Sequence, residues 1–180
     1  MKERSKKELT SIARNVSLLI LDVDGVLTDG GIILDSKENE LKSFHVRDGH
    51  GIKMLVRAGI RVAIITGRYS RVVERRAREL GIKDIFQKCL DKTIAYRQLA
   101  ETYSLRDGDI AYVGDDIVDI PVFRRCGLPV AVADAEDAVK PFVKMTTRNN
   151  GGQGAVREVC DFLLKAKGLW KDIIREYAET

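Results

Sequence analysis

The sequence lacks any long apolar run. Its longest apolar stretches, such as Val16–Leu21 and Val62–Ile65, are far shorter than the roughly 20 residues that a membrane-spanning helix needs. The chain also opens without the basic and then apolar segments of a secretory leader. We therefore expect neither secretion nor a membrane span, and the cytoplasm is the expected location.

Cysteine is scarce as well. Cys89, Cys126 and Cys160 are widely separated, and no C-x-x-C spacing occurs. An odd number of distant cysteines favours neither a disulfide framework nor a zinc site. This absence also fits the cytoplasm.

Neither sign of charge dominates the chain. The 180 residues include 31 basic and 27 acidic side chains, and beyond the first fourteen residues the two kinds are interleaved. We therefore expect no nucleic-acid partner, whereas the mild basic excess suits a small anionic substrate. Hydrophobic residues make up 44% of the chain, which is enough for one sizeable core, so we expect a single domain over residues 1–180.

Short apolar strings alternate with amphipathic segments. The expected strands are 16–21, 61–65, 109–113 and 129–132, and the expected helices are 49–58, 70–80, 91–103 and 116–126. Gly59, Gly81 and Gly127 follow three of these helices, where left-handed helix ends are typical. The alternation predicts an α/β fold, a doubly wound, Rossmann-like parallel sheet with helices on both faces. Such sheets bind ligands beyond the carboxyl ends of their strands.

Three segments stand outside this alternation. Residues 1–14 are polar and basic and predict a surface helix or a frayed arm. Residues 31–46 place two apolar stretches around a polar centre, which predicts a β-hairpin projecting from the sheet. Residues 149–180 begin with the glycine-rich NNGGQG and continue as helical sequence. Because this loop lacks the G-K-[ST] ending of a P-loop, we interpret it as a flexible element leading to the last helices.

Carboxylates and a hydroxyl stand where the expected strands end. Asp22 and Asp24 follow the first strand, Thr66 follows the second, and Asp115 and Asp116 follow the third. Any one carboxylate could be a helix cap. Several carboxylates on one edge repel one another, however, unless a cation or a shared proton relieves them.

The ligand types favour Mg²⁺ over zinc. All the candidate ligands carry oxygen, while His45 and His50 lie outside the cluster and have a surface or packing role as their alternative. Lys92 supplies one further positive charge. Mg²⁺ held by few carboxylates keeps waters and binds substrate phosphate, so we expect phosphoryl transfer at this edge.

Four motifs occur in a fixed order. They are LDVDGVLT at Leu21–Thr28, ITGR at Ile65–Arg68, DK at Asp91–Lys92 and GDDxxD at Gly114–Asp119. In this order they resemble the four motifs of the haloacid dehalogenase superfamily of phosphatases. The resemblance implies a Mg²⁺-dependent phosphatase with a Rossmann-like fold.

Two further stretches narrow the resemblance. FHVRDG at Phe44–Gly49 and GGQGAVREV at Gly151–Val159 are similar to the branch that acts on 3-deoxy-D-manno-octulosonate 8-phosphate, an eight-carbon sugar-acid phosphate of lipopolysaccharide synthesis. A nine-carbon sugar-acid phosphate is the alternative substrate, although Arg68 in ITGR favours the eight-carbon branch.

The resemblance implies roles for the residues of the motifs. Asp22 would be the nucleophile that forms an aspartyl-phosphate, and Asp24 would protonate the leaving oxygen and later activate water. Thr66 and the backbone N–H of Gly67 would donate to the phosphoryl oxygens, and Lys92 would balance the charge.

The metal ligands also follow from the resemblance. Mg²⁺ would be held by the carboxylates of Asp22 and Asp115 and by the backbone carbonyl of Asp24. Asp116 and Asp119 would orient the metal or the lysine, and an ordinary place on a helix surface is the alternative for Asp119.

The sugar-acid site would draw on several segments. By resemblance it is lined by Asp24, His45, Val46, Arg47, Asp48, Gly49, Lys53, Gly67, Arg68, Arg76 and Lys92. Arg68 and Arg76 are candidates for bidentate binding of a carboxylate, and a solvated helix face is the alternative for Arg76. The sequence departs from the family at His45, where asparagine is usual, and at Lys53, where arginine is common.

The spacing of the motifs leaves no room for a lid. The stretches between Asp22 and Thr66 and between Thr66 and Lys92 are too short to hold the core units and a separate lid domain. The hairpin 31–46 is the candidate cover, and in the family it covers the site of a neighbouring subunit in a tetramer. The resemblance therefore implies a homotetramer.

Two other function classes use similar residues. A receiver-type phosphoacceptor domain also gathers aspartates, a threonine and a lysine on a parallel sheet, but its acidic pair comes first and its acceptor aspartate later. A non-catalytic oligomerisation module would keep the fold, but the intact motifs argue against it.

Overall fold

The protein is built on one parallel sheet. The computed structural model describes residues 6–179, and its six-stranded sheet has the order β5-β4-β1-β6-β7-β8. The strands are β1 Leu18–Leu21, β4 Arg61–Ile65, β5 Asp84–Phe86, β6 Ile110–Gly114, β7 Leu128–Ala131 and β8 Met145–Thr146. In the centre, β1 pairs in parallel with β4 and β6. All four of its residues are buried, because helices cover both faces of such a sheet.

The four expected strands are confirmed, with shifts of one or two residues at their ends. β5 and β8 were not expected. They have three and two residues, too few to stand out as apolar strings, and they form only because a neighbouring strand offers a free edge.

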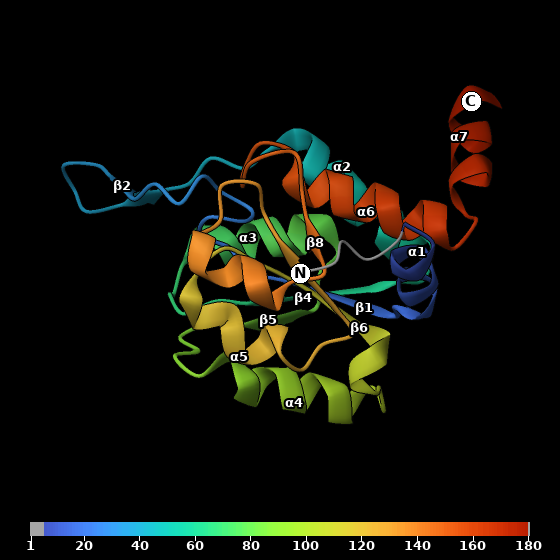
Figure 1. Ribbon diagram of the computed structural model, residues 1–180. Helices are drawn as coiled ribbons and strands as arrows, with labels where there is room; N and C mark the ends of the chain where they lie inside the picture. The colour runs from blue at the N-terminus through green and yellow to red at the C-terminus, as the bar shows by residue number, and fades with distance from the viewer. Residues whose placement is uncertain (1–5, 180) are drawn as a thin grey trace.

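Helices cover both faces of the sheet (Figure 1). One face carries α1 Lys6–Asn15, α2 Val46–Arg57, α3 Arg71–Leu80 and α6 Ala155–Ala166, and the other carries α4 Lys92–Thr102 and α5 Ile120–Phe123. The last helix, α7 Trp170–Glu179, stands beyond the end of α6 (Figure 1). This is the expected doubly wound α/β fold, and the described residues include no cap domain.

One expected helix is wrong. Residues 116–126 form a short 3₁₀ turn, Ile117–Asp119, followed by the single-turn α5. Pro121 lies in the first turn of α5, and the Asp119 carboxylate turns back to accept the backbone N–H of Asp115 at 2.9 Å. These contacts wind the chain into a tight loop where periodicity alone predicts a regular helix.

The glycine expectations hold at two of three positions. Gly59 and Gly81 have φ of 81° and 79°, as left-handed residues after α2 and α3 should. Gly127 is not left-handed. A Cβ there would come within 2.7 Å of Gly108, so this glycine is needed for a close backbone approach.

The hairpin projects from the body as expected (Figure 1). Its strands, β2 Ile33–Leu34 and β3 Glu40–Leu41, are antiparallel and form a separate sheet. Its apolar side chains Ile32, Ile33, Leu34 and Leu41 are 50–60% exposed. The ribbon therefore buries little of its own apolar surface.

The glycine-rich loop makes backbone hydrogen bonds to two other segments. The Gly152 N–H donates to the Val26 carbonyl at 2.9 Å, and the Gly151 N–H donates to Asp134 Oδ1 at 2.9 Å. The first bond holds the loop against the segment that follows Asp24, and the second holds it against Asp134 in the loop after β7.

The two ends of the chain are partly described. α1 agrees with the expected surface helix, and the first five residues of the basic arm lie outside the described residues. No helix within residues 6–179 is long and apolar enough to span a membrane.

Candidate active site

The site lies where the winding of the sheet reverses. From β1 the chain crosses by α2 to β4 on one side, whereas β6 lies on the other side and leads through α5 to β7. Asp22 follows β1 and Asp115 follows β6, so both stand at the switch point where open α/β sheets bind ligands. Thr66 follows the adjacent β4 and is buried.

Lys92 connects two aspartates. It opens α4, whose N-cap is Asp91, and its Nζ lies 2.7 Å from Asp22 Oδ2 and 2.6 Å from Asp119 Oδ1. Burial disfavours the ammonium, but the two carboxylates outweigh burial, and the pKa of Lys92 lies above its ordinary value. Lys92 is therefore a fixed cation beside Asp22.

Asp119 is fully buried rather than a surface charge. Its Oδ1 also accepts the Tyr112 hydroxyl at 2.6 Å, and its Oδ2 accepts the Asp115 N–H at 2.9 Å. Asp119 thus holds both the lysine and the loop that carries Asp115. Tyr112 is a contributor that sequence reasoning missed, because a tyrosine inside an apolar strand gives no separate signal.

Asp116 has a different place from its neighbours. It is exposed, and its side chain accepts the Ile117 N–H at 2.6 Å. It caps the 3₁₀ turn, which is the alternative that applies to any single carboxylate at a strand end.

Asp22 and Asp115 carry unusual proton affinities. Burial raises the pKa of Asp22 to about 6, although Lys92 opposes that rise. Burial, followed by the charge of Asp22, raises the pKa of Asp115 to about 7. Within the described residues no hydrogen bond reaches the Asp115 carboxylate, so this carboxylate lacks a hydrogen-bond partner.

These carboxylates fit a hard divalent cation. Oxygens of Asp22, Asp115 and Asp119 lie within 4.8 Å of one another. Each Asp119 oxygen already accepts two hydrogen bonds. Each Asp22 oxygen accepts only one, so Asp22 and Asp115 have the free capacity. An all-oxygen donor set with an unpartnered carboxylate is what Mg²⁺ prefers.

Asp24 is held by cations that do not contact Asp22. The Lys42 ammonium forms an ion pair with Asp24 Oδ1, and Arg68 Nε lies 3.7 Å from Asp24 Oδ2. The side chain of Lys42 is only 1% exposed. Sequence reasoning missed Lys42, because a lysine on a projecting hairpin is expected in solvent.

The structure brings the other candidates into a second group around the start of α2. Asp48 is buried and caps α6, since its carboxylate accepts the N–H groups of Arg157 at 2.7 Å and Gly154 at 3.3 Å. Arg76 lies against Gly49, where a Cβ would come within 2.2 Å of its Nη2.

Two buried nitrogens in this second group are unpaired. His45 Nδ1 and Arg76 Nε have no hydrogen-bond partner among the described residues. Val46, Arg47 and Lys53 are exposed along α2. Arg68 belongs instead to the carboxylate centre, because its Nε lies 3.7 Å from Asp24 Oδ2.

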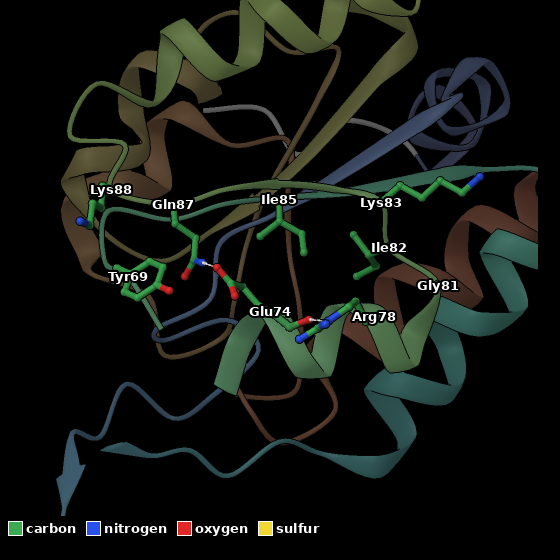
Figure 2. A pocket seen from close by; sticks show the side chains of 9 residues that line it. All are labelled: Tyr69, Glu74, Arg78, Gly81, Ile82, Lys83, Ile85, Gln87 and Lys88. Atoms are coloured by element: carbon green, nitrogen blue, oxygen red, sulfur yellow. Dashed lines mark hydrogen bonds between the residues drawn. The ribbon is translucent and has the colours of Figure 1, made fainter. Parts of the chain in front are cut away.

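A cavity of about 930 Å³ lies between α3 and the edge strand β5. Figure 2 shows its lining, where Gln87 donates to Glu74 at 2.9 Å and the Lys88 ammonium lies 5.2 Å from the centre of the Tyr69 ring. These polar groups bind one another, and none of the aspartates at the sheet edge lines the cavity. We assign it no part in the chemistry.

The carboxylate centre has the parts of a phosphoryl-transfer site. It offers a buried carboxylate with a fixed ammonium beside it, a second carboxylate that fits a metal, and a further carboxyl group in Asp24.

Comparisons with known proteins agree with this chemistry. The haloacid dehalogenase-like hydrolase family matches residues 78–159. The 3-deoxy-D-manno-octulosonate 8-phosphate phosphatase of Yersinia pestis is 49% identical over 155 residues, which cover 86% of this chain and 83% of that protein. The corresponding phosphatase of Escherichia coli K12 is 51% identical over 156 residues, which cover 87% of this chain and 83% of that protein.

A solved structure shares the whole fold. The 3-deoxy-D-manno-octulosonate 8-phosphate phosphatase of Moraxella catarrhalis, solved with a magnesium ion, a phosphate ion and a KDO molecule, superposes with a TM-score of 0.94. It is 39% identical, and the match covers 96% of this chain and 99% of that one.

Proposed function

Because this chain belongs to the 3-deoxy-D-manno-octulosonate 8-phosphate phosphatases, among the haloacid dehalogenase-like hydrolases, we propose that it hydrolyses that substrate to the free sugar acid and phosphate. The observation that carries the proposal is the buried contact of Lys92 with Asp22 at the switch point of the sheet. This reaction belongs to the synthesis of lipopolysaccharide precursors.

Asp22 is the proposed nucleophile. One of its carboxylate oxygens attacks phosphorus, the bond from phosphorus to the sugar oxygen breaks, and an aspartyl-phosphate forms. Asp24 donates a proton to the leaving sugar oxygen. It then takes a proton from the water that attacks the aspartyl-phosphate, which releases phosphate and restores both aspartates.

The proposed Mg²⁺ ligands are the carboxylates of Asp22 and Asp115 and the backbone carbonyl of Asp24. The cation, when bound, offsets the repulsion between an anionic nucleophile and an anionic phosphate. The unpartnered Asp115 carboxylate supports this assignment.

Several groups of the chain would position the phosphoryl group. Lys92 supplies a fixed positive charge beside Asp22, and Asp119 holds Lys92 in place. Thr66 and the Gly67 N–H would donate to phosphoryl oxygens at the end of β4.

The sugar acid would be recognised by cations. We assign its carboxylate to Arg68, which borders Asp24, because a guanidinium binds a carboxylate with two parallel hydrogen bonds. Arg76 and the residues His45, Val46, Arg47, Asp48, Gly49 and Lys53 would complete the sugar site.

We further propose a cytoplasmic homotetramer of single-domain chains. The exposed apolar residues Ile32, Ile33, Leu34 and Leu41 of the hairpin support this assembly, because pairing with a neighbour would bury them. The hairpin of one chain would then cover the site of the next.

Phosphate release from a panel of sugar and sugar-acid phosphates, with and without Mg²⁺, tests the function. We expect Mg²⁺-dependent turnover with the eight-carbon sugar-acid phosphate as the preferred substrate. A preference for a nine-carbon sugar-acid phosphate would make that compound the proposed substrate instead. If none of the phosphate esters released phosphate, the proposed function would be contradicted.

A further inference from the structure

Four side chains of alternating charge form a ring beside the carboxylate centre. Lys42 contacts Asp24 and lies 3.3 Å from Glu40 Oε1. The same Glu40 oxygen lies 3.0 Å from Arg68 Nη2, and Arg68 Nε lies 3.7 Å from Asp24 Oδ2. The ring of Asp24, Lys42, Glu40 and Arg68, here called the charge ring, has no net charge.

Glu40 is the member of the charge ring that can move away from Arg68. Asp24 and Arg68 lie in the loops just beyond β1 and β4 of the central sheet, whereas Glu40 lies on β3 of the projecting hairpin. The hairpin packs little of its own surface, since its apolar side chains are exposed. Glu40 pairs with Leu34 next to the turn of this hairpin, and the hairpin is therefore easier to displace than the sheet edge.

Glu40 is an anion at neutral pH. Burial alone would raise its pKa, but hydrogen bonds and charges from Ser70, Lys42 and Arg68 outweigh burial, and the pKa lies below its ordinary value. The side chain is 17% exposed, so this anion is partly shielded from water. Its contact with Arg68 is a charge-assisted hydrogen bond of ordinary length.

We propose that the Glu40 carboxylate binds the Arg68 guanidinium when no substrate carboxylate is bound there. Glu40 is thereby a specificity-determining residue. The proposal rests on the proposed function, since it takes the Arg68 guanidinium as the binding group for the sugar-acid carboxylate. A second carboxylate on Arg68 would lie against Glu40, and like charges in a partly buried site repel. An incoming sugar acid must therefore displace Glu40.

The displacement is inexpensive because Glu40 keeps a partner. Lys42 lies 3.3 Å from the same Glu40 oxygen, so Glu40 leaves Arg68 without becoming an unpaired charge. A phosphate ester without a carboxylate offers Arg68 no replacement and leaves the contact intact. Glu40 thus makes access to Arg68 conditional on a carboxylate, and it links the turn end of the hairpin to occupancy of the site.

The substitution Glu40→Gln tests this role. It removes the competing charge, so KM for the sugar-acid phosphate and the inhibition constant of the free sugar acid should both fall, by roughly two- to five-fold for a partly exposed ion pair. KM for p-nitrophenyl phosphate, which has no carboxylate, should not change. Glu38→Gln is the matched control, because it removes the same charge from the same exposed hairpin and should change none of these constants.

A second variant keeps the test decisive if Glu40→Gln does not fold. Glu40→Asp keeps the charge but shortens the reach to Arg68, so it should lower KM for the sugar-acid phosphate in the same direction. Thermal unfolding of both variants reports whether they fold. If Glu40→Gln does not fold, Glu40→Asp alone decides the matter.

The outcomes separate this inference from the proposed function. Unchanged or raised KM for the sugar-acid phosphate in a folded variant, with an active wild type, would overturn the role of Glu40 and leave the proposed function standing. An equal fall in KM for both substrates would also overturn it, because Glu40 would then act on any anion. A wild type that hydrolyses p-nitrophenyl phosphate but no sugar-acid phosphate would remove both proposals.

Discussion

Gly151 lies so close to Gly25 that a Cβ on Gly151 would come within 1.7 Å of the Gly25 carbonyl oxygen. Gly25 in turn follows Asp24 with φ of 86°, and a Cβ there would come within 2.0 Å of Asp115 Oδ2. The glycine-rich loop, the turn after Asp24 and the Asp115 carboxylate are therefore packed in series. The loop thus has a structural role in the site, because its close contact with Gly25 restricts the conformation of the turn after Asp24.

Gly151→Ala should destabilise the protein and lower kcat. The added methyl group forces the loop away from Gly25, which costs about 1–3 kcal/mol as overpacking and shifts the turn after Asp24. Denaturant unfolding and phosphate release measure the two effects. Gly108→Ala is the control, because a Cβ there meets nothing within 4 Å; equal behaviour of the two variants would contradict the packing argument.

Asp22→Asn should abolish turnover. The amide keeps the shape of the side chain but removes the nucleophilic charge, while Lys92 retains Asp119 as a partner. Phosphate release at saturating Mg²⁺ measures the loss. Activity above a few per cent of the wild type, judged by losses from removed nucleophiles, would show that the nucleophile lies elsewhere.

Asp24→Asn should slow turnover greatly and leave Mg²⁺ affinity almost unchanged. The proposed metal contact of this residue is its backbone carbonyl, which the substitution preserves. Calorimetric titration with Mg²⁺ and steady-state kinetics separate the two properties. Weakened Mg²⁺ binding with normal turnover at saturating metal would reverse the assigned role.

Metal-free protein should lose stability as pH rises from about 4 to about 7. The pKa values of Asp22 and Asp115 are raised to about 6 and about 7 from 3.8. The folded state therefore binds more protons than the unfolded state in this window, and the stability that these groups contribute is full below 3.8 and declines as pH rises through the folded values. Denaturant unfolding in a chelator should show the decline, and Asp115→Asn should reduce it.

Mg²⁺ should reverse that trend. Its binding requires deprotonated carboxylates, so affinity should increase as pH rises toward 7. Melting temperatures with and without Mg²⁺ across this range provide the measurement, and a Mg²⁺ effect that does not depend on pH would contradict the assignment of Asp22 and Asp115 as ligands.

Ile33→Asp should weaken assembly. Ile33 is 50% exposed on β2 and lies opposite Leu41 in the hairpin, so a charge there opposes burial against a neighbour. Light scattering should show a shift to smaller species, and KM for the sugar-acid phosphate should rise more than KM for p-nitrophenyl phosphate. A wild type that is fully active as a monomer would contradict the proposed assembly.

The sequence by itself determined the four central strands of the sheet and the edge at which the site lies. Parallel strands bring their carboxyl ends to one edge whatever the loops do, so the positions of Asp22, Thr66 and Asp115 directly after apolar strings were enough to predict the cluster. The order of the motifs along the chain indicated the family, because that order can be read from the sequence without the fold.

Only the tertiary structure decided which charges are buried and what they contact. Periodicity cannot show that Asp119 turns inward while Asp116 stays exposed, since that depends on how the loop after β6 packs against Lys92. Lys42 reaches Asp24, and Gly151 meets Gly25, across long separations in sequence. Burial and ion pairing depend on what surrounds a side chain in space, and the local pattern of a sequence does not contain that information.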